Sequence, residues 1–131
     1  MITVPEINEI SSRIIGAAIT VHRELGPGLL ESVYQSCMAI EIGDNSLRVE
    51  SEVPVPVIYR GKEIHKEGFR LDLLVEGVVV VELKSVEKIL SVHKKQLLTY
   101  LKLADKKLGL LINFNEELLV NGITRISNGL Q

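Results

Sequence analysis

The sequence has 131 residues, of which 46% are hydrophobic and 4% aromatic, and its formal net charge is −2 at pH 7. This length and composition predict one ordered globular domain over residues 1–131, small enough to leave room for help from a protein partner or a second copy in a homodimer. The weakly acidic charge argues against a protein that is basic throughout and binds nucleic acid in a general way.

The N-terminal part of the chain predicts two helices. Hydrophobic residues recur at helical spacing over residues 7–25, Pro5 suits the first turn, and the Gly-Pro-Gly sequence at 26–28 ends this helix. A second helix is expected from near residue 29 to residue 42, and Gly43-Asp44-Asn45 ends it.

Three strands follow. The first, at residues 49–59, contains Pro54 and Pro56, which favour an edge or irregular position in a sheet. The next two surround Asp72 and Glu82 and are apolar at nearly every position, which is typical of a sheet covered on both faces.

The last part of the chain predicts a helix at residues 86–106, a buried strand at 108–114 and a short strand near 123–126. The order ααβββαβ, with this short final strand, predicts an α/β (α+β) fold in which helices flank a central mixed β-sheet.

A single cysteine, Cys37, excludes an internal disulfide framework and fits a reducing compartment. No signal sequence is recognisable, and no apolar segment approaches the roughly 18 residues of a membrane span. We therefore expect a soluble cytoplasmic protein without a membrane segment.

Three charged residues lie in the two apolar strands, and they need an explanation. Isolated buried carboxylates are costly, so Asp72, Glu82 and Lys84 must be paired or must hold a cation. Residues two apart in a strand share a face, which places Glu82 and Lys84 together. A hard divalent cation held by the two carboxylates beside the lysine is the arrangement of a metal-dependent phosphodiesterase.

The loop between the strands decides whether Asp72 joins that face, because a one-residue change of register moves every side chain to the other side. A two-residue turn would place Asp72 on the wrong face. A three-residue loop at 76–78, with its glycine in the left-handed conformation of a bulge, pairs Val75 with Val79 and Asp72 with Glu82. We predict this register.

A structural ion pair near a strand end is the alternative explanation for the same three charges. The charge distribution bears on this choice: residues 1–59 hold three basic and eight acidic residues, a net charge of −5, whereas residues 60–107 hold eleven basic and seven acidic ones, a net charge of +4. Local positive charge beside a metal site suits a phosphate backbone, although the same lysines can simply be the solvated faces of a hairpin and a helix.

Two further groups of polar residues fall on the predicted helices. Glu31 and Tyr34 are three apart and therefore neighbours, although Glu31 also suits a helix start for electrostatic reasons alone. His93, Gln96 and Tyr100 form a polar stripe, which is either the solvated side of its helix or a face turned toward the Glu-x-Lys strand.

Taken together, the motifs Gly28-x-x-Glu31-x-x-Tyr34, Asp72, Glu82-x-Lys84 and Gln96-x-x-x-Tyr100, in this order, resemble the GxxExxY proteins. These proteins look like the RecB-like branch of the PD-(D/E)XK nuclease superfamily. The resemblance spans residues 15–114. The superfamily's proline before its aspartate is replaced by Leu71, and that proline is not a ligand.

The resemblance implies a role for each matching residue. Metal ligands would be Asp72, Glu82 and the backbone carbonyl of Leu83, and Lys84 would orient or activate the attacking water. Glu31 would be an accessory acidic residue near the metal, and Gln96 and Tyr100 would position the surroundings of the ion or the phosphate. Oxygen-only ligation suits Mg²⁺ or Mn²⁺, and the chain lacks the Cys/His cluster that zinc prefers.

The function implied is that of an Mg²⁺-dependent nuclease that hydrolyses phosphodiester bonds, with DNA as the expected substrate. The alternative is a catalytically silent protein of the same fold that binds nucleic acid or a protein partner.

Overall fold

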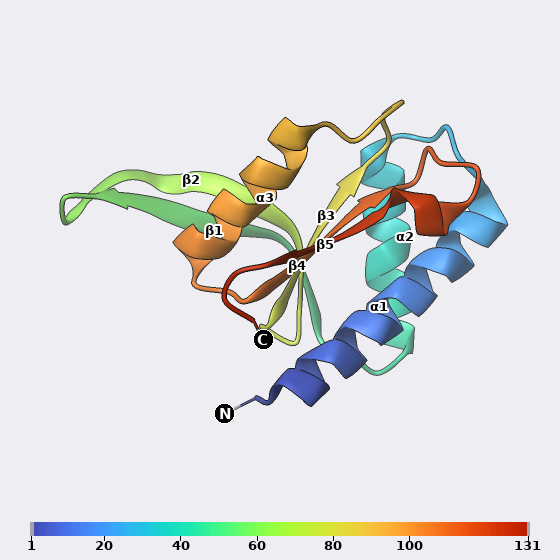
Figure 1. Ribbon diagram of the computed structural model, residues 1–131, viewed down its shortest axis with the longest axis horizontal. Helices are drawn as coiled ribbons and strands as arrows, with labels where there is room; N and C mark the ends of the chain where they lie inside the picture. Colours follow the sequence, from blue (N-terminus) through green and yellow to red (C-terminus); the bar gives the residue numbers. More distant parts are fainter. Residues whose placement is uncertain (1, 131) are drawn as a thin grey trace.

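The computed structural model describes residues 2–130, except the side chains of residues 66 and 67. Its helices and strands follow the order α1 (Val4–Leu25), α2 (Glu31–Asp44), β1 (Val49–Tyr59), β2 (Lys62–Val75), β3 (Val79–Lys84), α3 (Ser91–Ala104), β4 (Leu108–Asn113), the 3₁₀ helix η1 (Leu119–Gly122) and β5 (Ile123–Ser127) (Figure 1). The predicted order of elements is confirmed.

The strands form one five-stranded sheet in the order β1-β2-β3-β4-β5. The β3–β4 pair is parallel, and the other neighbours are antiparallel, so the sheet is mixed as predicted. The parallel pair needs a crossover connection, and the segment that contains α3 supplies it. The proline-containing strand β1 lies at an edge, where a missing backbone donor costs least.

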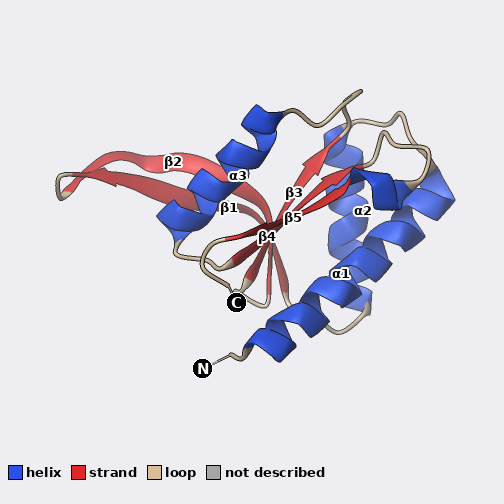
Figure 2. Ribbon diagram, viewed as in Figure 1, coloured by secondary structure: helices blue, strands red, loops and turns tan. Residues whose placement is uncertain are grey.

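Helices cover both faces of the sheet, as the apolar strands predicted. Figure 2 shows α1 and α2 on one face and α3 on the other. Every residue of β3 except Lys84 is buried, as is every residue of β4. Two hydrophobic clusters fill the layers: one joins α1 and α2 to the sheet, and the other includes Leu97 and Leu101 of α3.

The ends of α1 follow the expected capping chemistry. The Thr3 side chain accepts a hydrogen bond from the backbone N–H of Glu6 at 3.2 Å, and Pro5 lies in the first turn. Gly26 ends the helix with a φ of +71°, a conformation that glycine adopts without steric cost. None of the helices among residues 2–130 is both long enough and apolar enough to cross a membrane.

Helix α3 begins at Ser91, five residues later than predicted, because a buried side chain holds the preceding segment in another conformation. The Asn113 amide, at the end of β4, accepts from the backbone N–H of Val86 at 3.1 Å and donates to the Val86 carbonyl at 2.9 Å. His93 then caps the helix, since its Nδ1 accepts from the backbone N–H of Leu90 at 2.9 Å.

The β1–β2 hairpin is much longer than its partner strand. Strand β3 pairs with β2 only from Leu73 to Val75, so the rest of the hairpin projects from the body as the ribbon in Figure 1. The pairing register shifts on both sides of Val57. At this place Gly68 approaches β1 so closely that an added Cβ would lie 2.3 Å from Val57 Cγ2, which excludes a larger residue without movement of the strands.

Candidate active site

The loop between β2 and β3 sets the register of the two acidic residues. Val75 pairs with Val79 across a three-residue loop at 76–78, as predicted. Gly77 has a φ of +66°, and Glu76 also has a positive φ, +55°, which the sequence did not indicate. Glu76 is held there by Arg48, because the Glu76 N–H donates to the Arg48 carbonyl and its carboxylate accepts from the Arg48 N–H. The ladder ends at Leu73 opposite Val81, and the next residues outward on the two strands are Asp72 and Glu82.

Two hydrogen bonds between backbone and carboxylate join Asp72 to the Glu82-Leu83 segment of β3. The backbone N–H of Asp72 donates to Glu82 Oε2 at 2.8 Å, and the backbone N–H of Leu83 donates to Asp72 Oδ2 at 2.8 Å. Each carboxylate thus takes the place of a backbone acceptor on the opposite strand. Two acidic side chains are thereby fixed beside one another at the point where the hairpin leaves the sheet.

Burial and mutual repulsion make both carboxylates hard to ionise. Burial, followed by the negative charge of Asp72, raises the pKa of Glu82 from 4.5 to about 8. The pKa of Asp72 is raised as well, mainly by burial. The positive charge of Lys84 lowers the pKa of both groups, so it acts on the same site. One lysine does not offset the loss of hydration of two carboxylates.

Glu31 reaches the site from the first residue of α2. Its Oε2 accepts from the backbone N–H of Ser85, directly after β3, at 3.2 Å, and its charge raises the pKa of Asp72. The Ser85 hydroxyl donates to the Leu29 carbonyl at 2.6 Å, which fastens the loop before α2 to the same strand end.

Tyr34, the last residue of the Gly-x-x-Glu-x-x-Tyr motif, is fully buried, and its hydroxyl forms hydrogen bonds with the backbone. Its hydroxyl donates to the Gly26 carbonyl at 2.5 Å and accepts from the Leu29 N–H at 3.2 Å. Its ring stacks on Phe114 with centroids 4.4 Å apart. The motif therefore combines a tyrosine that shapes the loop between α1 and α2 with a glutamate at the site.

The stripe on α3 divides into two parts. Burial and then the negative charges of Glu82 and Asp72 raise the pKa of Tyr100, while a hydrogen bond from Gln96 lowers it. Tyr100 therefore lies near the two carboxylates. Its ring stacks on Phe69 of β2 at 4.1 Å. Gln96 and Tyr100 thus belong to the face turned toward Glu82, whereas His93 caps its own helix.

Glu52 of β1 is an acidic neighbour that sequence reasoning missed. It lies between Ser51, which pairs with Leu73, and Val53, which pairs with Leu71, and therefore opposite Asp72. Its charge raises the pKa of both Asp72 and Glu82. The pairing of the first two strands would have revealed it, but the bulges in that hairpin make the pairing unreadable from the sequence.

The backbone is irregular where these acidic residues meet. Glu52 has a φ of +53°, which is uncommon for a residue other than glycine. On β2, Leu71 packs in the cluster under α3 but Leu73 packs in the cluster on the opposite face, so strand alternation is broken at Asp72. Strained backbone of this kind concentrates at functional sites.

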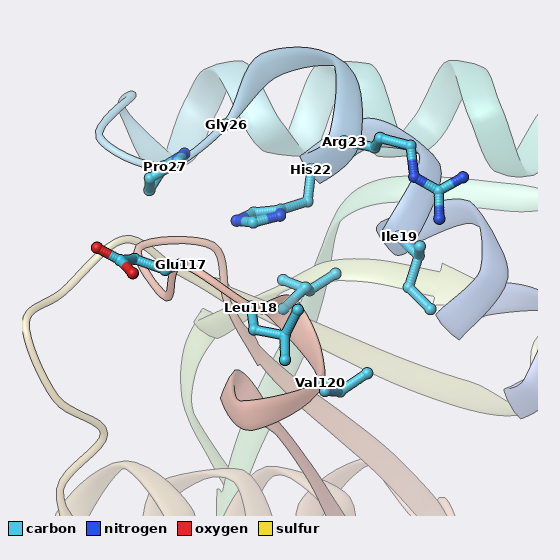
Figure 3. A pocket seen from close by; sticks show the side chains of 9 residues that line it. Ile19, His22, Arg23, Gly26, Pro27, Glu117, Leu118 and Val120 are labelled. Atoms are coloured by element: carbon cyan, nitrogen blue, oxygen red, sulfur yellow. The ribbon is translucent and has the colours of Figure 1, made fainter.

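A cavity of about 510 Å³ lies elsewhere, between the end of α1 and η1 (Figure 3). His22 points into this region, and its Nε2 lies 2.7 Å from the carbonyl oxygen of Glu116. The lining residues include Arg23 and Leu118 but none of the acidic residues around Asp72. His22 therefore has a structural contact away from the carboxylate pair.

The oxygen donors of Asp72 and Glu82 fit a hard divalent cation. Their hydrogen bonds use Oδ2 and Oε2, so the second oxygen of each carboxylate can face an ion. Bound positive charge would lower the raised pKa values, which is what two adjacent buried carboxylates require. Among the described residues, no group of three or more His, Cys, Asp or Glu side chains is gathered closely enough to hold a metal by itself. The remaining ligands would then be backbone, water or phosphate oxygens, as is usual for Mg²⁺.

Comparison with known protein families gives a match over most of the chain. Residues 8–126 match the family model described as PD-(D/E)XK nuclease superfamily. No curated protein and no solved structure matches significantly.

Proposed function

The chain belongs to the PD-(D/E)XK nuclease superfamily, and on this basis we propose that it is a metal-dependent nuclease that hydrolyses phosphodiester bonds in DNA. The observation that carries the proposal is the Asp72–Glu82 pair: each carboxylate accepts a hydrogen bond from a backbone N–H of the neighbouring strand, and the pKa of Glu82 is raised to about 8. A structural role alone does not account for two acidic groups that repel each other in a partly dry site.

Each residue has a proposed task. Asp72, Glu82 and the Leu83 carbonyl hold Mg²⁺ or Mn²⁺, which when bound supplies a Lewis acid for the phosphoryl oxygen and lowers the pKa of a water molecule. Lys84 shares the face of Glu82 and orients or activates the attacking water. Glu31, fixed by the Ser85 N–H, accepts a hydrogen bond from a water in this space. Gln96 and Tyr100 position the phosphate from the side of α3.

The finer assignments also belong to this proposal. The Gly28, Glu31 and Tyr34 positions support a place among the GxxExxY proteins of the RecB-like branch. The single cysteine supports a cytoplasmic location. A homodimer or a protein partner would complete a domain that is small for selecting its own substrate.

Cleavage of labelled single- and double-stranded DNA and RNA, with Mg²⁺ or Mn²⁺, tests the proposal. We expect the wild type to cleave DNA and Lys84→Ala to lose cleavage while its Mn²⁺ affinity changes little, because Lys84 is not a ligand. Lys107→Ala, a change at an exposed lysine outside α3, is the matched control and should retain activity. Equal cleavage by wild type and Lys84→Ala would contradict the proposed mechanism.

The second candidate function is a silent binding protein of the same fold. The backbone hydrogen bond that each carboxylate accepts without any metal is the observation that favours it. In that case the wild type would bind nucleic acid or a protein but would cleave no substrate with either metal.

A further inference from the structure

The distal part of the β1–β2 hairpin projects from the body of the fold (Figure 1). We define the arm tip as residues 57–65. Nearer the body, Val55 and Phe69 still belong to the cluster under α3. Beyond them the two strands pair only with each other, from Val57 opposite His65 to Tyr59 opposite Lys62 (Figure 1). The side chains of this ribbon are therefore available to bind another molecule.

The side chains at the arm tip are exposed and of mixed character. Ile58, Tyr59 and Ile64 are 54%, 59% and 52% exposed. Arg60 and Lys62 flank Gly61 in the turn and are also exposed, and the Arg60 guanidinium lies 5.3 Å from the centre of the Tyr59 ring. This cation–π contact holds the guanidinium at the end of the ribbon.

Charge changes sign along the hairpin. The near part of β1, up to Pro56, carries only the acidic residues Glu50 and Glu52, whereas the arm tip carries Arg60 and Lys62 against a single Glu63. Helix α3, which packs over the base of the hairpin through the Tyr100–Phe69 stack, has exposed lysines and no acidic residue. Exposed basic groups thus lie on α3 and at the turn, and the arm tip has a net charge of +1 from Arg60, Lys62 and Glu63.

We propose that the arm tip binds the backbone of a duplex nucleic acid whose scissile phosphate lies at Asp72 and Glu82. This inference rests on the proposed nuclease function and adds the form of the substrate. A two-stranded β-ribbon fits the major groove of B-DNA. Arg60 and Lys62 contact phosphates there, and Tyr59 and Ile58 give the ribbon an apolar surface against the groove.

The length of the ribbon gives the spacing of the two contacts. Ten residues separate Lys62 from Asp72, so at about 3.3 Å per residue the arm tip lies at most roughly 33 Å from the site. Duplex DNA rises about 3.4 Å per base pair, so the tip reaches up to about ten base pairs from the scissile bond. A duplex is stiff over this distance, with a persistence length of about 150 base pairs, and can span the two contacts without folding back.

Binding measurements on duplexes of two lengths test the arm tip. We compare Arg60→Ala/Lys62→Ala with Arg23→Ala/Lys107→Ala, a control that removes the same charge from exposed positions outside the arm, by fluorescence anisotropy in EDTA. On a duplex of about 30 base pairs, the arm variant should bind roughly tenfold more weakly at low salt, and its slope of log K against log salt should fall by about two. On a duplex of about six base pairs the arm variant and the control should bind alike.

Equal binding of the long duplex by the arm variant and the control would overturn the proposal, as would equal losses on both lengths. Equal losses on single-stranded DNA of the same length would overturn the assignment to duplex. Loss of self-association without loss of nucleic-acid binding would identify the arm tip as a protein contact instead.

A small diester separates this inference from the nuclease proposal. Bis-p-nitrophenyl phosphate can occupy the site without touching the arm, so wild type and arm variant should cleave it equally with Mn²⁺. If neither protein cleaves any substrate but binding of the long duplex still depends on Arg60 and Lys62, the nuclease proposal fails and duplex binding by the arm tip stands. If the diester is cleaved and the arm variant binds the long duplex normally, the nuclease proposal stands and the arm proposal fails.

Discussion

At the scale of single residues, burial and mutual repulsion favour the protonated forms of Asp72 and Glu82 in the metal-free protein. Each carboxylate retains one hydrogen bond from the opposite strand, which orients it but does not replace its lost hydration. The pair is therefore sensitive both to pH and to bound positive charge.

The pH dependence of stability follows from the raised pKa of Glu82. Between pH 4.5 and about pH 8, the folded protein holds a proton on Glu82 that the unfolded chain has released. Stability from this group is complete below the unfolded value and is lost as pH rises through the folded value. We expect the melting temperature of the metal-free protein to fall between about pH 5 and pH 8, and to fall less in Glu82→Gln, as measured by thermal melts in EDTA. Parallel curves for the two proteins would contradict this expectation.

Glu52 should influence the same titration through its charge. Glu52→Gln removes a negative charge that raises the pKa of Asp72 and Glu82, so both carboxyls should titrate at lower pH in NMR spectra of carboxyl-labelled protein. Glu50→Gln, two residues earlier on the same edge strand, is the matched control and should leave the titration in place. Identical pKa shifts in both variants would mean that the place of Glu52 opposite Asp72 does not determine its effect on the titration.

At the scale of elements, the site depends on how β3 and β4 end. The two strands are parallel, and their last pair joins Lys84 to Asn113. Asn113 then fixes the turn toward α3, so the segment after the candidate catalytic lysine is held from the neighbouring strand.

Asn113→Ala should therefore destabilise the protein and disturb the site. The change removes the acceptor of the Val86 and Asn115 N–H groups and the donor to the Val86 carbonyl, all at a fully buried side chain. Unpaired buried groups of this kind cost about 1–3 kcal/mol each, so we expect a loss of about 3 kcal/mol in urea denaturation. Asn121→Ala, at an exposed position in η1, should cost less than about 0.5 kcal/mol. Similar losses in the two variants would show that the Asn113 bonds are not responsible.

Sequence reasoning succeeded where the controlling residues are local. The loop at 76–78 could be predicted because strand parity and Gly77 leave one register that brings Asp72 to Glu82. The start of α3 could not, since Asn113 acts on Val86 from 27 residues away. Glu52 was missed for a related reason, because the bulges around Val57 and Gly68 separate sequence spacing from strand pairing.

At the scale of the whole molecule, the two explanations for the acidic residues predict opposite effects on stability. If they form a metal site, Asp72→Asn relieves repulsion, keeps an acceptor for the Leu83 N–H, and should raise or at least not lower the metal-free melting temperature. The variant should also lose most of the stabilisation by Mn²⁺, which for a native-state ligand at a hundredfold excess over Kd is about 2.7 kcal/mol.

A structural ion pair predicts the reverse pattern. Loss of the aspartate charge would then leave Lys84 without its partner, destabilise the metal-free protein by roughly 3–5 kcal/mol if the pair is buried, and leave no metal response to lose. Thermal melts of wild type and Asp72→Asn, in EDTA and through a Mn²⁺ titration, distinguish the two patterns.

The hairpin that joins Asp72 to Glu82 also has a consequence for the order of folding. Ten residues separate the two carboxylates, whereas the pairing of β3 with β4 joins Val79 to Leu108 and must close a loop almost three times as long. Short loops close at a lower entropic cost, so the acidic pair can meet while water still surrounds it and before the parallel strand arrives. Desolvation of the carboxylates then accompanies the docking of β4, and this late step, not hairpin formation, is where we expect refolding to slow as pH rises.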